Sequence, residues 1–153
     1  MLESIAIGSD HRGFPLKEAL KPLLESMVAR VEDRGTCSSE SVDYPVFARL
    51  VAGAVSRGEV QRGLLICGSG IGMSVAANKF PGVRAALCHD LHSARMSREH
   101  NNANILVLAE SVTAELAAEM VRVWIETDFQ GGRHQRRLDL IAQIEQENFT
   151  AGC

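Results

Sequence analysis

The sequence predicts a single α/β domain built on a Rossmann-like, doubly wound parallel sheet of five strands, with flanking helices and a C-terminal helix. Short aliphatic runs alternate with longer stretches of helical period. This alternation favours right-handed crossovers and a parallel sheet covered on both faces. The 153 residues are 46% hydrophobic and contain no linker or internal repeat, so residues 1–153 form one domain with its own core.

Each expected strand is a short β-branched or aliphatic run, and helical patterns follow it. The strands cover residues 4–8 (SIAIG), 29–33 (ARVED, the least apolar), 63–67 (GLLIC), 83–88 (VRAALC) and 104–109 (NILVLA). Helical patterns lie between them at 14–29, 45–57, 70–79 and 92–100, and two more follow at 112–127 and 134–147. Because such sheets bind ligands at the carboxyl ends of their strands, the residues directly after each strand are the candidate functional positions.

Charge and hydropathy argue against two classes of partner. The formal net charge is −3, and the mixed charges lack the basic face that nucleic-acid binding requires. No apolar run approaches the roughly 20 residues that span a bilayer. The N-terminus MLESIAIGSD has neither the basic lead nor the cleavage site of a signal peptide. We therefore expect a cytoplasmic protein that has no nucleic-acid or membrane partner.

The four cysteines are expected to be free thiols. Cys37, Cys67, Cys88 and Cys153 include no close CxxC-type pair, and no signal peptide precedes them. The same spacing argues against a metal cage.

The stretch LLICGSGIGMSVAANKF, residues 64–80, contains an unusual glycine-rich turn. Gly68, Gly70 and Gly72 follow a predicted strand and open a predicted helix, so N–H groups can point into a concavity at the positive end of the helix dipole. Such a concavity binds an anion. The alternative is that the glycines only allow a tight turn and close packing. A G-x-G-x-x-G fingerprint fails at Met73, and no Lys-Ser or Lys-Thr pair closes a Walker loop.

Cys67 ends the strand before this turn. A buried free cysteine at a strand end is usually an inert small hydrophobe, and Cys88 is expected to be one. A helix N-terminus and converging amides favour the thiolate form, however. A thiolate beside an anion cradle is suited to abstract a proton next to a carbonyl, with donors ready for the oxyanion. Cys67 is therefore the candidate base.

Asp10 and His11 follow the first strand, in GSDHRGF. Because the carboxyl ends of parallel strands meet at one edge of the sheet, both side chains should open onto the same cleft as the glycine-rich turn. The alternative for Asp10 is to cap the helix that begins near Phe14, and this role does not exclude ligand binding.

Two later stretches supply further candidates. SREHNNAN puts His100 and Asn101 at a helix end, where a histidine can simply complement the helix dipole. Arg133 and Arg137 in GGRHQRRLDLI lie four residues apart on one helical face and could grip a phosphate, or could form a solvated basic face. Cations at a helix N-terminus are electrostatically disfavoured, and a bound anion would relieve this.

Together these stretches carry a family resemblance. GSDHRGF, DYP (43–45), CGSGIGMSVAANKFPGVRAALC, SREHNNANIL and GGRHQRR resemble, in this order, the B-type ribose-5-phosphate isomerases and the related galactose-6-phosphate isomerase subunits, over residues 4–147. The resemblance implies a metal-independent aldose–ketose isomerase without a cofactor, which interconverts ribose 5-phosphate and ribulose 5-phosphate through a cis-enediolate in the pentose phosphate pathway. It also implies a homodimer, or a dimer of dimers, whose sites share residues of both subunits.

By this resemblance, Cys67 is the base that moves a proton between carbons 2 and 1 of the opened sugar. The Ser69 hydroxyl would shuttle the oxygen-bound proton. The enediolate oxygen would be held by the amides around the turn, at Gly68, Ser69, Gly70, Ile71 and Gly72.

The resemblance assigns ring opening and substrate binding to other residues. His100 would open the furanose, with Asp10 on the ring oxygen or hydroxyl and Tyr44 close by. Asn101 would bind the sugar hydroxyls, and the phosphate would be bound by His11, Arg133 and Arg137.

One position departs from the family pattern. The family usually carries a phosphate-contacting arginine just after the fifth strand, whereas this chain has Ser111 there and Glu110 beside it. Arg12 could supply the missing charge. Two alternatives therefore remain: an isomerase of another aldose phosphate, such as allose or galactose 6-phosphate, or a non-catalytic partner subunit that binds a sugar phosphate. The presence of Cys67 and His100 in one chain favours the enzyme.

Overall fold

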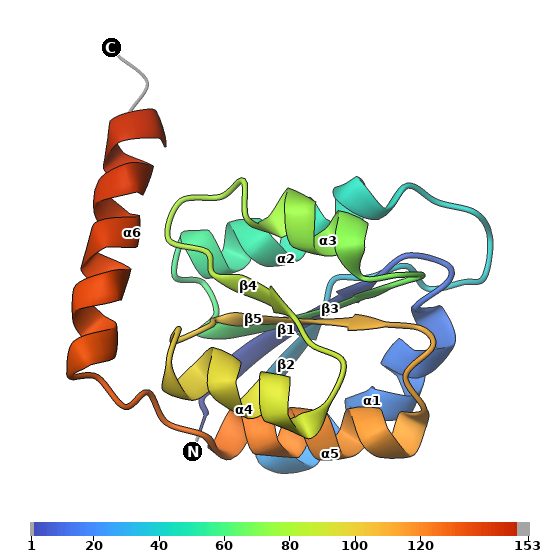
Figure 1. Cartoon of the computed structure of the whole chain (residues 1–153). Helices are drawn as coiled ribbons and strands as arrows, with labels where there is room; N and C mark the ends of the chain where they lie inside the picture. The colour runs from blue at the N-terminus through green and yellow to red at the C-terminus, as the bar shows by residue number, and fades with distance from the viewer. Residues whose placement is uncertain (1, 150–153) are drawn as a thin grey trace.

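The computed structural model describes residues 2–149 and confirms the predicted α/β fold (Figure 1). One parallel sheet has the order β2-β1-β3-β5-β4. Its strands are β1 (Ser4–Ser9), β2 (Arg30–Asp33), β3 (Arg62–Cys67), β4 (Ala85–Leu87) and β5 (Ile105–Ala109). The helices are α1 (Phe14–Met27), α2 (Tyr44–Ser56), α3 (Ile71–Ala77), α4 (Leu91–Glu99), α5 (Ala114–Glu126) and α6 (Arg133–Phe149).

Every element lies where the sequence predicts it, and β4 differs most in length. The prediction covered residues 83–88, whereas the strand covers only Ala85–Leu87. The N–H groups of Arg84 and Ala85 donate to the side-chain oxygens of Asn104 and Asn78, at 2.8 and 2.9 Å. The asparagine side chains accept hydrogen bonds from N–H groups that, in a longer strand, would donate to the backbone of a neighbouring strand.

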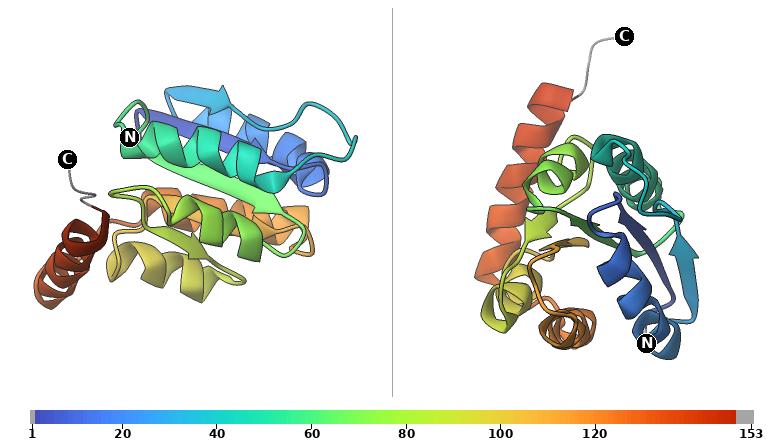
Figure 2. Two further views of the ribbon diagram at one scale, coloured as in Figure 1. Left: turned by 90° about the horizontal axis from the view of Figure 1, so that it is seen from above. Right: turned by 90° about the vertical axis from the view of Figure 1, so that its right-hand side faces the viewer.

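Helices cover both faces of the sheet, α2 and α3 on one and α1, α4 and α5 on the other (Figures 1 and 2). Successive strand residues point to opposite faces. Ile7, Leu64 and Ile66 accordingly belong to the core beneath α1, α4 and α5. Leu65 and Cys67 belong to the core beneath α2 and α3. Burial on both faces explains why the strands are near-continuous apolar runs rather than alternating ones.

The direction of winding reverses between β1 and β3, which are neighbours in the sheet. The helix that follows β1 packs on one face, and the helix that follows β3 packs on the other. The loops after these two strands therefore turn toward opposite faces, and doubly wound sheets bind ligands at the carboxyl ends of such strands.

Helix α6 stands apart from the two helical layers, beyond the edge strand β4 (Figure 2). Leu138 packs inward, and the Glu145 carboxylate accepts a hydrogen bond of 2.8 Å from the N–H of Gly82. Four of its apolar side chains stay between 48% and 59% exposed, namely Leu140, Ile141, Ile144 and Phe149. An exposed apolar row of this length is unusual for a helix that has solvent as its only neighbour.

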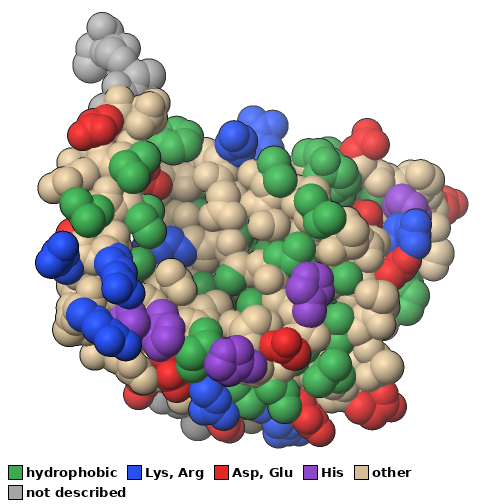
Figure 3. All heavy atoms as spheres, viewed as in Figure 1, with side chains coloured by type: hydrophobic (Ala, Val, Ile, Leu, Met, Phe, Trp, Pro, Cys, Tyr) green, Lys and Arg blue, Asp and Glu red, His purple; other side chains and the backbone are tan. Residues whose placement is uncertain are grey.

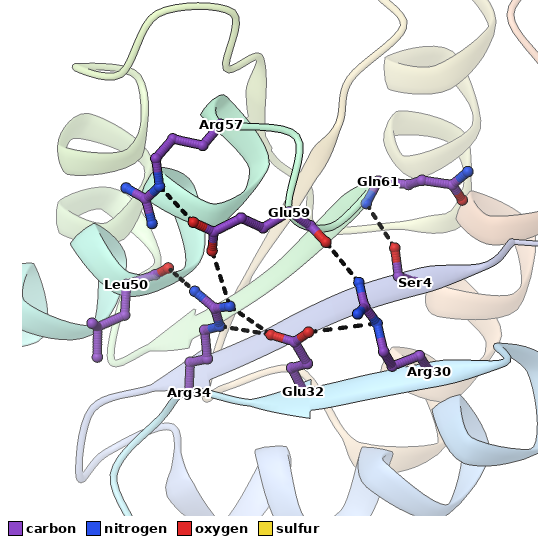
Figure 4. A network of polar contacts seen from close by, with 8 residues as sticks. All are labelled: Ser4, Arg30, Glu32, Arg34, Leu50, Arg57, Glu59 and Gln61. Atoms are coloured by element: carbon purple, nitrogen blue, oxygen red, sulfur yellow. Dashed lines mark hydrogen bonds and ion pairs between the residues drawn. The ribbon is translucent and has the colours of Figure 1, made fainter.

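The opposite edge strand, β2, carries charges in place of an apolar row. Arg30, Glu32 and Arg34 alternate along and after it, and they join Arg57 and Glu59 in one network (Figure 4). Charged side chains on an edge strand discourage pairing with another chain. The two edges of the sheet therefore differ in chemical character.

No helix among residues 2–149 is long and apolar enough to cross a membrane. Cys37, Cys67 and Cys88 are free thiols, as predicted, and Cys153 lies outside the described residues.

A buried lysine ties α1 to the end of β2. Lys17 is 1% exposed and forms ion pairs with Asp33 and with Glu18, while Lys21 reaches Asp33 at 2.9 Å. Burial alone would raise the pKa of Asp33, but hydrogen bonds from Lys17, Lys21 and the N–H of Gly35 outweigh it and hold this pKa below its ordinary value. The ionised carboxylate therefore stabilises the fold.

Asp33→Asn should lower the free energy of unfolding by about 1–3 kcal/mol at pH 7, because it leaves Lys17 with a weaker partner in a buried place. The contribution of a carboxylate with a depressed pKa is present above its unfolded pKa and is lost as the pH falls through the folded one. Urea unfolding at fixed protein concentration should therefore show the deficit at pH 7, and the deficit should shrink below about pH 4.

Glu18→Gln is the matched control, because it removes the more exposed partner of the same lysine and should cost less than about 1 kcal/mol. Equal losses in the two variants would contradict a special role for Asp33.

Candidate active site

The glycine-rich turn brings backbone donors to the sulfur of Cys67. The Cys67 side chain is buried, and the N–H of Gly70 donates to its Sγ atom at 3.2 Å. Gly70 has a φ of 76°, in the left-handed region, and is the N-cap of α3. This conformation turns the chain back over the end of β3, so the sulfur lies at the positive end of a helix. Ser69 is exposed, and its Oγ accepts from the N–H of Ile71 at 3.2 Å.

Two glycines of the turn, Gly70 and Gly72, are required by close packing, as one of the two sequence interpretations expects. A Cβ at Gly70 would collide with Leu87 and would lie 3.3 Å from the backbone of Leu108. A Cβ at Gly72 would lie 2.5 Å from the ring of Tyr44. The Tyr44 ring therefore covers the turn at Gly72, next to the first residues of α3.

Asp10 and His11 lie in the loop between β1 and α1. Asp10 is buried, and its Oδ1 accepts from the N–H of Gly13 at 2.9 Å, which closes the turn before α1. The Nδ1 atom of His11 accepts from the N–H of Val42 at 3.2 Å. In this arrangement a neutral His11 ring carries its proton on Nε2, where it is available to a ligand oxygen.

An ion pair between Arg12 and Glu110 crosses the glycine-rich turn. Arg12 follows β1 and Glu110 follows β5, the two strands that flank β3. The Arg12 guanidinium lies 3.6 Å from the position of a Cβ on Gly68, and the N–H of Glu110 donates to the carbonyl oxygen of Cys67 at 2.9 Å. Hydrogen bonding to Arg12 lowers the pKa of Glu110. The Arg12 charge that could have replaced a lost cation at Ser111 is therefore shared with a carboxylate.

The remaining predicted residues lie near the amino ends of the strands, at the opposite end of the sheet from Cys67. His100 is the C-cap of α4, and Asn101 follows it in the link to the amino end of β5. Arg133 is the first residue of α6, and Arg137 lies one turn further along it. From its amino end to its carboxyl end, β3 takes five residue steps of about 3.3 Å. These four side chains therefore belong to a region roughly 17 Å from Cys67.

Two residues that the sequence analysis left unassigned hold this second region in shape. Asn102 has a φ of 45°, a left-handed conformation that asparagine tolerates, and it ends α4 sharply. Arg98 is 5% exposed and donates to the carbonyl oxygens of Ala103 and Thr127, at 2.6 and 3.3 Å. Burial, together with Arg62 and Arg84, lowers the pKa of Arg98 to about 10. No local sequence pattern marks Arg98, because its hydrogen bonds go mostly to backbone carbonyl oxygens, one of them 29 residues away at Thr127.

The His100 ring stacks on the ring of His134, with centroids 4.2 Å apart and an interplanar angle of 12°. His134 is 5% exposed and lies between the exposed Arg133 and Arg137 in sequence. Neither arginine has an ion-pair partner within residues 2–149. In Figure 3 basic side chains gather beside histidines at the lower end of α6. Two unpaired cations at a helix N-terminus suit an anion such as a phosphate.

Residues 2–149 contain no group of three or more His, Cys, Asp or Glu side chains that could hold a metal ion.

Known proteins are similar to this chain over most of its length. A family model described as Ribose/Galactose Isomerase matches residues 5–141. The ribose-5-phosphate isomerase B of Escherichia coli is 47% identical over 146 residues, which cover 95% of this chain and 98% of that relative.

Two solved structures are similar over nearly the whole chain. The ribose-5-phosphate isomerase B of Clostridium thermocellum has a TM-score of 0.91 at 51% identity and covers 94% of this chain and 98% of its own. That of Mycoplasma genitalium, with bound ribulose 5-phosphate, has a TM-score of 0.90 at 39% identity and covers 97% and 99%.

Gly70→Ala should destabilise the protein by about 1–3 kcal/mol, because alanine is strained at positive φ and its Cβ would collide with Leu87. Gly68→Ala is the matched control in the same turn, since its Cβ would make only ordinary contacts with Arg12. Urea unfolding of both variants measures the difference. A Gly68→Ala loss as large as that of Gly70→Ala would contradict the assignment of the strained position.

Proposed function

The chain belongs to the ribose/galactose isomerase family of sugar-phosphate isomerases, and from this premise we propose that it interconverts ribose 5-phosphate and ribulose 5-phosphate. The observation that carries the proposal is the position of Cys67 at the end of β3, with the Gly70 N–H on its sulfur and a turn of backbone donors beside it. A base next to an oxyanion cradle is what proton transfer at a carbon beside a carbonyl requires.

In the proposed proton transfer, the Cys67 thiolate removes the proton from carbon 2 of the open-chain aldose. The electron pair of that C–H bond forms the C1–C2 double bond, and the aldehyde oxygen becomes an oxyanion held by the amides of residues 68–72. Ser69, at the exposed rim of the turn, moves a proton from the oxygen on carbon 2 to that on carbon 1. The Cys67 thiol then protonates carbon 1, which leaves the ketose and regenerates the thiolate.

Ring opening is assigned to His100, with Asp10 orienting the sugar. In one chain these two groups lie at opposite ends of the strands. A pentose phosphate is much shorter than the strands are long. We therefore propose that each site combines the β1 and β3 loops of one copy with His100, Asn101, and the first turn of α6 of a second copy.

Exposed apolar side chains on two surfaces support assembly of two copies. Val46, Ile71 and Val75 on α2 and α3 are more than half exposed, and so is Ile144 on α6. A groove of about 390 Å³ between α6 and the sheet edge leaves further apolar surface open. Covering such surfaces with a second copy would remove them from water and would bring the two half-sites together.

The substrate's phosphate would be held by the Nε2–H group of His11 from one copy and by Arg133 and Arg137 from the other. The Arg12–Glu110 ion pair favours a second candidate, an isomerase of a different sugar phosphate. A guanidinium that is already shared with a carboxylate attracts a dianion less than a free one does, and it offers hydrogen bonds to sugar hydroxyls.

A comparison of pentose and hexose phosphates tests the substrate assignment. Purified protein should turn over ribose 5-phosphate with a kcat/KM at least about tenfold above those for allose 6-phosphate and galactose 6-phosphate. Cys67→Ser should lower turnover by about 10²–10⁴-fold, because a serine hydroxyl is a much weaker base at neutral pH. Faster reaction of a hexose phosphate would replace the pentose assignment with the second candidate.

Cys88→Ser is the control for loss of a buried thiol and should keep near-normal turnover. In heavy water, the wild-type product should carry solvent deuterium on the carbon that receives the proton. Such a label would exclude direct hydride transfer between the two carbons.

Mixing two inactive variants tests the shared site. In a dimer of Cys67→Ser with His100→Asn, one site carries both substitutions and the other carries neither. Unfolding and refolding an equal mixture should therefore restore about a quarter of wild-type activity on ribose 5-phosphate, since half of randomly paired dimers are mixed. Each variant refolded alone is the control. No recovery, in a mixture shown to contain mixed dimers, would place both residues in a site within one chain.

A further inference from the structure

The stacked histidine pair lies entirely within one chain, so the contact between the two rings does not need a second copy. His134 is the inner ring, 5% exposed, and His100 is the outer, half-buried ring. The nearly parallel rings at 4.2 Å leave little freedom to rotate either imidazole without disturbing the other. His134 therefore holds the plane of the His100 ring.

Four groups face His134 from the elements around it. Arg133 and Arg137 lie on its own helix, and Glu99 and His100 lie at the end of α4. Burial first, and then His100 and the two arginines, lower the pKa of His134, while Glu99 opposes them. Glu99 also accepts a hydrogen bond of 3.0 Å from the Nε2 of Gln130.

This environment decides which ring of the pair carries a proton. Two imidazolium rings stacked at this separation would repel each other strongly, so the pair holds at most one proton near neutral pH. Because His134 is the more buried ring, it is the ring that stays neutral. A neutral ring stacked on an imidazolium is attractive, as in a cation–π contact.

We propose that His134 is a positioning residue that leaves the pair's proton to His100, and that a phosphate bound by Arg133 and Arg137 promotes uptake of that proton. The chemical role of the coupling rests on the proposed function. The two negative charges of a phosphate beside the pair would favour an imidazolium there by direct attraction. A substrate that carries a phosphate would thus bring the acid for its own ring opening into the protonated state.

The proton balance of this step is simple. His100 takes a proton from solvent when the phosphate binds. As the bond between carbon 1 and the ring oxygen breaks, His100 gives this proton to the ring oxygen, and the anomeric hydroxyl loses its own proton to water. The aldehyde and a neutral His100 result, with no oxidant or cofactor required.

The coupling can be measured without turnover, by NMR titration of the histidine Cε1–H signals of the full chain with and without inorganic phosphate. The midpoint of His100 should rise by roughly one pH unit in saturating phosphate, while His134 stays neutral to lower pH. Arg137→Ala should remove the shift, and Arg136→Ala, an exposed cation on the same helix, should keep it. Phosphate that binds without moving the midpoint would overturn the coupling. Failure of phosphate to bind would instead contradict the assigned phosphate site.

The positioning role has a separate kinetic readout. His134→Ala should slow the reaction of cyclic ribose 5-phosphate by about tenfold or more and should largely spare the initial reaction of open-chain ribulose 5-phosphate. His134→Phe keeps a flat ring for the stack and should restore much of the lost rate. Equal losses in both directions, or no rescue by phenylalanine, would mean that His134 only supports the fold.

Discussion

The common direction of the five strands is the constraint on which the rest of this structure depends. The carboxyl ends of parallel strands all lie at the same end of the sheet. The loops after β1, β3 and β5 therefore meet there and bring Asp10, Cys67 and Glu110 together. For the same reason, every crossover helix must run back toward the amino ends of the strands. His100 and the start of α6 are therefore separated from Cys67 by the length of the strands.

The site at the carboxyl edge depends on the conformation of a few backbone atoms. Gly70 turns the chain so that an N–H group reaches the Cys67 sulfur, and Leu87, Leu108 and Tyr44 leave no room for larger residues at two of the glycines. The contact with the Cys67 sulfur and the close packing therefore both depend on Gly70. The packing that forbids side chains there is also what keeps the donors in place.

Charges are distributed unequally between the two regions. At the carboxyl edge the Arg12 cation is paired with Glu110, and the β2 edge carries a closed network of arginines and glutamates. The cations of the α6 end, Arg133 and Arg137, have no carboxylate partner among residues 2–149. An anion gains most where the protein's own charges are not yet satisfied, and here this place adjoins the stacked histidines.

The sequence by itself determined the order and type of all the elements, because hydrophobic periodicity and glycine-rich turns act over a few neighbouring residues. It also indicated Cys67, Asp10 and His11 as one cluster, because strand direction alone puts them at one edge. Apart from the family resemblance, nothing in the sequence distinguished His100, Arg133 and Arg137 from that cluster. Their distance from Cys67 depends on where the helices pack in the tertiary structure. The Arg12–Glu110 pair and the stack of His134 on His100 were decided only by the tertiary structure, because their partners lie 98 and 34 residues apart in the chain and meet only after the crossovers have packed.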